Sequence, residues 1–106
     1  MIVKEFLRDR NFIMSEICFT IRERAYCKDG FNISIQQSPF HYCGFDEVEL
    51  GFPSEKVEEL EAYAEDWDNP TRTVYNNIPI SLIEAIVATH GGIDKELSLK
   101  NRRKRW

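Results

Sequence analysis

Large apolar residues occupy every second position in three stretches of the chain, residues 17–22, 31–36 and 48–52. This period of two is typical of strands that bury one face. A proline, Pro39 or Pro53, follows each of the last two stretches within three residues. Because proline cannot donate a ladder hydrogen bond, it favours an end to the strand there. We therefore expect three strands before residue 54.

The first two strands are predicted to form a hairpin around a Lys-Asp-Gly loop at residues 28–30. A two-residue Asp-Gly turn would place the apolar residues of the two strands on opposite faces, because a slip of one residue turns a strand over. A three-residue loop pairs Cys27 with Phe31 and Ala25 with Ile33, and keeps the large apolar residues on one face. The glycine of this loop then takes the left-handed position of a G1 bulge.

A helix is predicted over residues 82–90. Ser81 and Glu84 stand at the spacing of a capping box, in which each side chain accepts an N–H bond of the first turn. Ile80 would pack on Ala85 as a hydrophobic staple. The glycine that follows the segment is a typical C-terminal cap.

Shorter elements complete the fold class. We expect a short helix over residues 3–9 and a fourth strand over residues 71–76. The prediction is therefore an α+β fold, with a small antiparallel β-sheet of three to four strands packed against two to three helices. A chain of 106 residues fits a single domain, here residues 1–99, followed by a flexible basic tail over residues 100–106.

Negative charge is concentrated in the block SEKVEELEAYAEDWD, residues 54–68. It holds seven carboxylates and one base, Lys56. Apolar residues recur at helical spacing in residues 55–67, and Ser54 stands at the N-cap position. On such a helix all the acids fall on the face opposite the apolar stripe. Like charges four residues apart cost roughly 0.2–0.5 kcal/mol per pair. Repulsion between the acids would therefore destabilise this helix.

Two interpretations of this acidic face remain open. It is either a solvated surface whose early glutamates favour the helix dipole, or a surface whose carboxylates take the place of nucleic-acid phosphates. The second interpretation assigns partner binding to Glu55, Glu58, Glu59, Glu61, Glu65, Asp66, Trp67 and Asp68.

The small size, a pI of about 5.2 and the acidic block together resemble the small acidic anti-CRISPR and antirestriction proteins of phages and mobile genetic elements. The resemblance is one of type and rests on no shared motif. It implies a non-enzymatic inhibitor that binds a nucleic-acid-binding protein, such as a CRISPR effector or a restriction nuclease. It leaves open whether the chain is a monomer or a homodimer.

The basic tail offers an alternative interpretation. Residues 100–106 contain five bases and end in a tryptophan. Such a segment can grip phosphates and stack on a base, as in a nucleic-acid-associated accessory protein. It can equally be a solubilising tail. The nucleic-acid contact would use Arg102, Arg103, Lys104, Arg105 and Trp106.

Residues 38–45 form a loop with an unusual aromatic content. Phe40, Tyr42 and Phe45 either close the core over the sheet or anchor a partner.

No catalytic or metal-binding motif emerges. His41 and Cys43 lack the spacing of a zinc knuckle, and no third group orients a pair of Cys43 with His41 or His90. The carboxylates of Glu47 and Glu49 are best explained by the acidity of their surroundings. The three cysteines are expected to be reduced and packed. We expect no enzyme activity, no catalytic residue and no cofactor.

The N-terminal sequence shows no apolar signal-peptide core, because charged residues interrupt it throughout. No apolar run approaches the roughly 20 residues that span a membrane. The expected location is therefore the cytoplasm.

Overall fold

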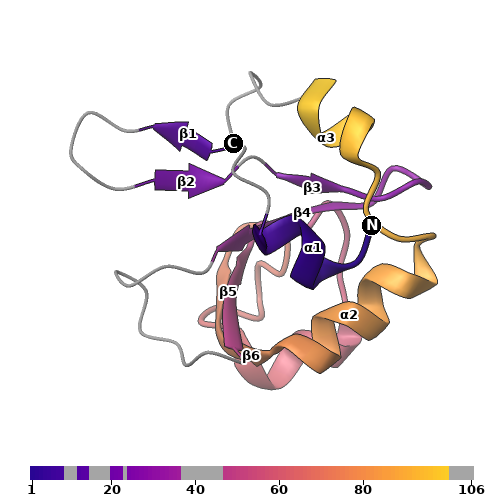
Figure 1. The fold of residues 1–106 in the computed structure, drawn as a ribbon. Coiled ribbons are helices and arrows are strands. Elements are labelled where there is room, and N and C mark those ends of the chain that lie inside the picture. The colour runs from indigo at the N-terminus through magenta and orange to yellow at the C-terminus, as the bar shows by residue number, and fades with distance from the viewer. Residues whose placement is uncertain (9–11, 15–19, 23, 37–46, 101–106) are drawn as a thin grey trace.

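The computed structural model of this chain describes residues 1–8, 12–14, 20–22, 24–36 and 47–100 (Figure 1). Its centre is a four-stranded antiparallel sheet in the order β3-β4-β5-β6. Helices pack on this sheet, so the predicted α+β fold class is confirmed.

The main sheet consists of β3 (Ala25–Tyr26), β4 (Asn32–Gln36), β5 (Glu47–Gly51) and β6 (Val74–Pro79). A separate two-stranded sheet, β1 (Phe12–Met14) with β2 (Thr20–Arg22), extends to one side of the main body in Figure 1. The helical elements are α1 (Val3–Arg8), the 3₁₀ helix η1 (Glu58–Tyr63), α2 (Ile80–Thr89) and α3 (Lys95–Lys100).

The register of the main sheet places its apolar residues on one face. Ile35 pairs with Leu50, and Leu50 pairs in turn with Tyr75. Side chains at paired positions lie on the same face of a sheet, so the alternation in β4 and β5 builds the core as the sequence predicts. The buried residues of this face are Ala25, Ile33, Ile35, Val48, Leu50, Tyr75 and Ile78.

The hairpin between β3 and β4 has the predicted three-residue loop. Ala25 pairs with Ile33. The Cys27 N–H donates to the Phe31 carbonyl at 2.7 Å, and the Gly30 N–H donates to the Cys27 carbonyl at 2.9 Å. Gly30 has a φ of 97°, which is the left-handed position that the G1 bulge requires.

The strand predicted over residues 17–22 is only partly confirmed. Within the described residues it is β2, and β2 pairs with β1. The short strand β3 occupies the place in the β3–β4 hairpin that the prediction gave to a continuous strand. Residues 17–19 lie outside the described part of the chain.

The fourth strand exists, but it begins later than predicted. β6 runs from Val74 to Pro79, because the residues before it are used in a turn, where the Arg72 N–H donates to the Asn69 carbonyl. The β5–β6 ladder shifts register between Val48 and Leu50. Asn77 takes up this irregularity with a φ of 58°, a conformation that asparagine tolerates better than most residues.

The capping box and the staple predicted for α2 are wrong. The helix begins at Ile80 with Pro79 as its N-cap residue, and no side chain caps it. Both Ser81 and Ile80 are therefore already helical. Glu84 instead accepts the Val3 N–H at 2.7 Å and the Lys4 N–H at 3.4 Å, so it caps the first turn of α1, 81 residues away in the sequence.

The predicted glycine cap of α2 is confirmed. Gly91 has a φ of 89°, and its N–H donates to the Ala88 carbonyl. The Gly92 N–H donates to the Val87 carbonyl, which completes a Schellman-type ending.

Both edges of the main sheet are covered. At the β3 edge, Cys27 forms a bridge with Ile93, and α3 packs on β3. At the β6 edge, Ala64 forms a bridge with Tyr75. Covered edges protect a sheet from pairing with another chain. α3 was not among the elements predicted by residue range, and the tail residues 101–106 lie outside the described chain.

Candidate partner-binding surface

The acidic segment, residues 54–68, does not form the helix predicted over residues 55–67. Ser54 is not an N-cap. Its hydroxyl accepts the Asn32 N–H at 3.0 Å, and its own N–H donates to the Asn32 carbonyl at 2.8 Å. Val57 is still extended, with φ −119° and ψ 106°. The segment therefore leaves β5 as an extended chain that is held against the first residue of β4.

Helical structure in this segment is limited to η1, the 3₁₀ helix Glu58–Tyr63. A 3₁₀ helix has three residues per turn, so Val57, Leu60 and Tyr63 fall on one face. Val57 and Leu60 are buried in the core, and Tyr63 packs against it. A spacing of three satisfies both helix types, which is why the apolar pattern did not separate them.

Past η1 the segment is fixed along β6. Ala64 is extended, with φ −72° and ψ 139°, and it pairs with Tyr75 in an isolated bridge. The Glu65 N–H then donates to the Val74 carbonyl at 3.1 Å. These backbone contacts hold the part of the acidic segment that follows η1 against the β6 edge of the sheet.

Asp66 has a structural part in the turn that follows. Its N–H donates to the Thr73 hydroxyl at 3.1 Å. Its carboxylate accepts the Asp68 N–H at 3.2 Å and the Asn69 side-chain amide at 2.9 Å. The bond from the Asp68 N–H, two residues further on, is that of an Asx turn, and the Asn69 amide adds a second contact to the same carboxylate. A partner that bound the Asp66 carboxylate would therefore compete with its bonds to Asp68 and Asn69.

A buried tyrosine closes the same turn. The Tyr75 hydroxyl donates to the Pro70 carbonyl at 2.5 Å. Burial raises the pKa of the Tyr75 hydroxyl, because the low dielectric disfavours the charged form. The hydroxyl therefore stays a donor, and the turn is attached to the centre of the core.

Trp67 and Lys56 meet on the outer side of the segment. The Lys56 ammonium lies 5.2 Å from the centre of the Trp67 ring and 3.4 Å from a carboxylate oxygen of Glu58. The one base of the segment is thus occupied by an aromatic face and one carboxylate. The remaining acids keep their negative charge unopposed within the segment.

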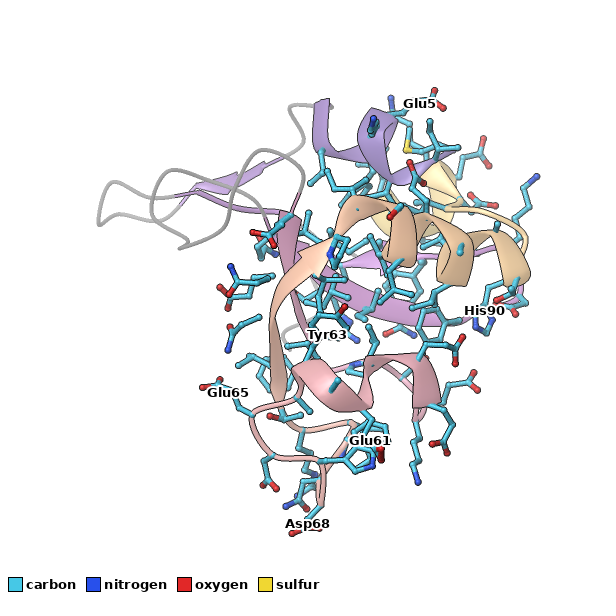
Figure 2. The ribbon with its side chains drawn as sticks, turned by 90° about the horizontal axis from the view of Figure 1, so that it is seen from below. Glu5, Glu61, Tyr63, Glu65, Asp68 and His90 are labelled. Atoms are coloured by element: carbon cyan, nitrogen blue, oxygen red, sulfur yellow. The ribbon has the colours of Figure 1, made fainter. Side chains whose placement is uncertain are left out.

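The acids of the segment are exposed. Figure 2 shows Glu61, Glu65 and Asp68 directed outward at the same end of the molecule, with Glu5 at the opposite end. These side chains come from a 3₁₀ turn, an extended stretch and a tight turn in succession. The acidic surface is therefore a curved rim that runs from Ser54, beside the start of β4, to Ala64 and Glu65, beside β6, and it is not the single helix face that the sequence predicted. Its exposed members are Glu55, Glu58, Glu59, Glu61, Glu65, Asp66 and Asp68.

Phe52 lies beside this rim and was not singled out by the sequence. Its side chain is 37% exposed, and its φ is 52°, a left-handed conformation that is uncommon for a bulky residue. Its N–H donates to the Thr73 carbonyl at 3.0 Å. Phe52 and Asp66 therefore both bond to Thr73, Phe52 to its carbonyl and Asp66 to its hydroxyl. The strand pattern alone assigned Phe52 to an ordinary buried position.

A half-buried arginine supports Phe52 from the other side. The Arg24 guanidinium donates to the Phe52 carbonyl and, at 3.0 Å, to the Asn32 side chain. Desolvation by burial lowers the pKa of Arg24 from its usual value. Several donors of this cation are committed to protein acceptors, which links β3, β4 and the end of β5.

Cys27 is a packed thiol, as the sequence predicts. It is fully buried, and burial raises the pKa of the thiol to about 11. A thiol that stays protonated is a poor nucleophile near neutral pH. Among the described residues there is no cluster of three or more metal-ligating side chains.

The other predicted contact residues fall in two stretches, residues 40–45 and 102–106. The aromatic residues Phe40, Tyr42 and Phe45, and the tail residues Arg102, Arg103, Lys104, Arg105 and Trp106, lie outside the described residues. None of the helices in the described ranges has the length and apolar character that crossing a membrane requires.

Comparison with known proteins gave no match to a family model, to a curated protein or to a solved structure.

Proposed function

We propose that this chain is a non-enzymatic binding protein that occupies the nucleic-acid site of its partner. The partner is a nucleic-acid-binding protein of the kind found in defence systems, such as a CRISPR effector or a restriction nuclease. The observation that carries the proposal is the fixed, exposed row of carboxylates along residues 54–68.

Charge density supports this choice of partner. Duplex DNA presents one negative charge per about 1.7 Å of its axis, and proteins bind it through lysine and arginine. The acidic rim presents seven carboxylates over fifteen residues, with one base among them. A groove built to neutralise phosphates would attract such a surface, and the attraction would speed encounter more than it would set the final affinity.

The rigidity of the rim also supports the proposal. Leu60 of η1 is fully buried, and Glu65 is bonded through its backbone to β6. Carboxylates on a fixed backbone lose less conformational entropy on binding than carboxylates on a mobile loop. Only their side chains then have to be ordered by the partner.

The residues of the surface have different parts in this proposal. Trp67 supplies an apolar contact, and Asp66 chiefly shapes the turn through its bonds to Asp68 and Asn69. The direct contacts to basic groups are assigned to Glu55, Glu58, Glu59, Glu61, Glu65 and Asp68. The complex would form in the cytoplasm, with the chain as a monomer or a homodimer.

The test is competition with DNA. The immobilised protein is incubated with a lysate that contains defence nucleases, and bound proteins are eluted with duplex DNA or with a salt gradient. A nucleic-acid-binding protein that is displaced by DNA and leaves at moderate salt supports the proposal. A partner that stays bound in excess DNA, or capture of nucleic acid itself by the chain, contradicts it; the second result would favour the basic tail.

A further inference from the structure

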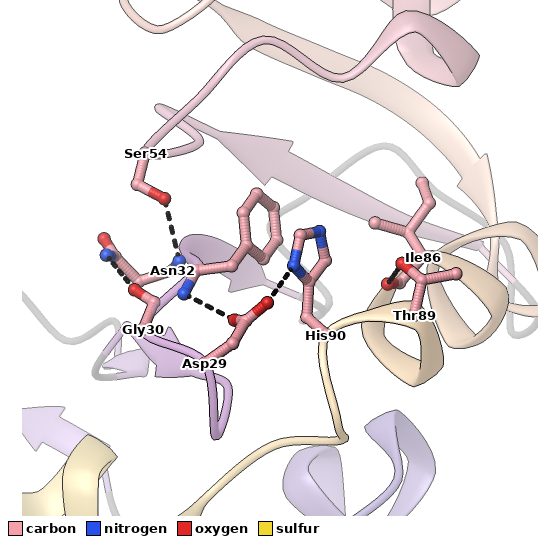
Figure 3. A network of polar contacts seen from close by, with 8 residues as sticks. Asp29, Gly30, Asn32, Ser54, Ile86, Thr89 and His90 are labelled. Carbon is pink, nitrogen blue, oxygen red and sulfur yellow. Dashed lines mark hydrogen bonds and ion pairs between the residues drawn. The ribbon is translucent and has the colours of Figure 1, made fainter.

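The C-terminal end of α2 meets the β3–β4 turn through one histidine and one aspartate (Figure 3). Nδ1 of His90 lies 2.6 Å from Oδ2 of Asp29. The imidazole also stacks on the Phe31 ring, with centroids 4.2 Å apart and an angle of 11° between the planes. The stack fixes the plane of the imidazole, so Nδ1 is held toward the carboxylate.

Backbone bonds join the same two elements. The Lys28 N–H donates to the Gly92 carbonyl at 3.1 Å, and the Asp29 N–H donates to the His90 carbonyl at 3.4 Å. The other carboxylate oxygen of Asp29 accepts the Phe31 N–H at 2.9 Å. Both oxygens of Asp29 are therefore used, one to shape its own turn and one to hold His90.

We propose that His90 and Asp29 form a proton-sensitive clamp, which holds the β3–β4 turn against the end of α2 more tightly when the imidazole is charged. The inference concerns the stability of this junction and does not depend on the proposed function.

The chemistry of the pair gives the direction of the effect. A neutral imidazole can still donate from Nδ1 to the carboxylate, so the contact survives deprotonation. A charged imidazole makes the bond charge-assisted, and such bonds are about twice as strong as neutral ones. Histidine is the side chain that ordinarily changes its charge between about pH 5 and 8.

Asp29 remains ionised through this range. The Phe31 N–H bond, followed by the His90 contact, holds the pKa of the Asp29 carboxyl below its usual value of about 3.9. A depressed carboxyl pKa stabilises the fold above about pH 4, and this contribution is lost only as the pH falls through the lower value. Asp29 therefore keeps its charge across the range, about pH 5 to 8, in which a histidine side chain ordinarily changes its own.

Other charged groups on the surrounding elements have mixed signs. The Met1 ammonium donates to the Ile93 carbonyl at 2.5 Å. They also include Lys28 on the same turn, Glu84 on α2, Asp94 and Lys95 at the start of α3, and Glu55 next to Ser54. Because these groups are of both signs and Asp29 is in direct contact with the imidazole, we expect the contact with Asp29 to determine the sign of the effect.

The test compares local opening at two pH values in wild type and Asp29→Asn. Asparagine keeps an acceptor for the Phe31 N–H and loses the charge that faces His90. The readout is the hydrogen-exchange protection factor of the Lys28 amide. We expect the variant to lose protection about tenfold near pH 5.5 and about twofold or less near pH 8.5. The control Glu96→Gln, an exposed carboxyl on α3, should show no loss at either pH.

A second comparison, made in the His90→Phe variant, separates the effect of the His90–Asp29 contact from a general effect of the Asp29 charge. His90→Phe preserves the ring stack on Phe31 and removes the nitrogen. In this background Asp29→Asn should cost the same protection at both pH values. An equal loss at both pH values in the wild-type background, or a pH-dependent loss that persists with His90→Phe, would overturn the proposal. If His90→Phe does not fold, the comparison of wild type with Asp29→Asn still tests the proposal, because an equal loss of protection at both pH values overturns it.

Discussion

Gly30 is the residue on which the register of the β3–β4 hairpin depends. Its φ of 97° is open to glycine at little cost, whereas other residues pay about 1–2 kcal/mol there. The conformation of Gly30 can be predicted from the sequence because the turn is local. Only a three-residue loop keeps the apolar residues of the two strands on one face, and glycine is the residue such a loop requires.

Gly30→Ala should lower the free energy of unfolding by about 1–2 kcal/mol. The space around a Cβ at this position is open, so the loss would come from the backbone alone. Urea unfolding at equilibrium measures it. Gly51→Ala is the matched control, because Gly51 has no positive φ and its Cβ would make ordinary contacts with Val74 and Ser34. A loss at Gly51 as large as that at Gly30 would contradict the explanation.

Cys27 makes a prediction about reactivity and alkaline pH. With a pKa of about 11, about one Cys27 thiol in a thousand is ionised at pH 8, so alkylation in the folded protein should be far slower than in urea. The folded state retains a proton that the unfolded state loses above about pH 8.5. The stability that the protonated Cys27 thiol gives to the folded state is therefore lost as the pH rises from about 8.5 toward 11. Peptide-level mass spectrometry resolves Cys27 from the other cysteines, and fast labelling in the folded state would contradict its burial.

At the scale of elements, local sequence patterns predicted some helices and strands correctly and others wrongly. The strands β4 and β5 and the glycine end of α2 depend on residues close together in the chain, and these predictions hold. The acidic α-helix was predicted wrongly because apolar residues at a spacing of three fit a 3₁₀ helix as well as an α-helix. A segment that binds along a sheet edge also needs an extended end, which Ala64 provides.

The role of Glu84 could not be predicted from its neighbours. A glutamate three residues after a serine is the signature of a capping box, yet its carboxylate caps α1 from 81 residues away. The strand β6 leads directly into α2 and so places Glu84 beside the first turn of α1. Tertiary packing of this kind leaves no trace in the sequence around Glu84.

Glu84→Ala should destabilise the protein by about 1 kcal/mol, as the loss of an N-terminal cap typically does. The Val3 and Lys4 amides should show the largest gain in hydrogen exchange, because they lose their acceptor. Ser81→Ala is the control: Ser81 is exposed within α2, and alanine favours a helix interior. If Ser81→Ala costs as much as Glu84→Ala, the sequence-based capping box would be the better description.

At the scale of the whole molecule, the chain carries a formal charge of −4, yet its acids are distributed unevenly. The core attaches the acidic segment to the β6 edge, while Glu5 lies at the other end (Figure 2). Sequence composition predicted the charge excess. The shape of the surface depends instead on the Ser54–Asn32 bonds and the Ala64–Tyr75 bridge, which join separate elements of the fold, and on the local turn at Asp66.

The proposed function is tested most directly by two charge-matched double variants. One, Glu61→Lys with Glu65→Lys, reverses charges on the acidic rim, and the other, Glu5→Lys with Glu96→Lys, reverses the same number elsewhere. Each changes the net charge equally. Binding is measured as the dissociation constant for the DNA-displaceable partner at several salt concentrations.

The proposal predicts that the rim variant loses at least about tenfold in affinity, together with much of its salt dependence, whereas the control changes about twofold or less. Equal losses would show that net charge acts without a defined surface. Undiminished binding by the rim variant would contradict the central claim that the carboxylates of residues 54–68 meet the nucleic-acid site of the partner.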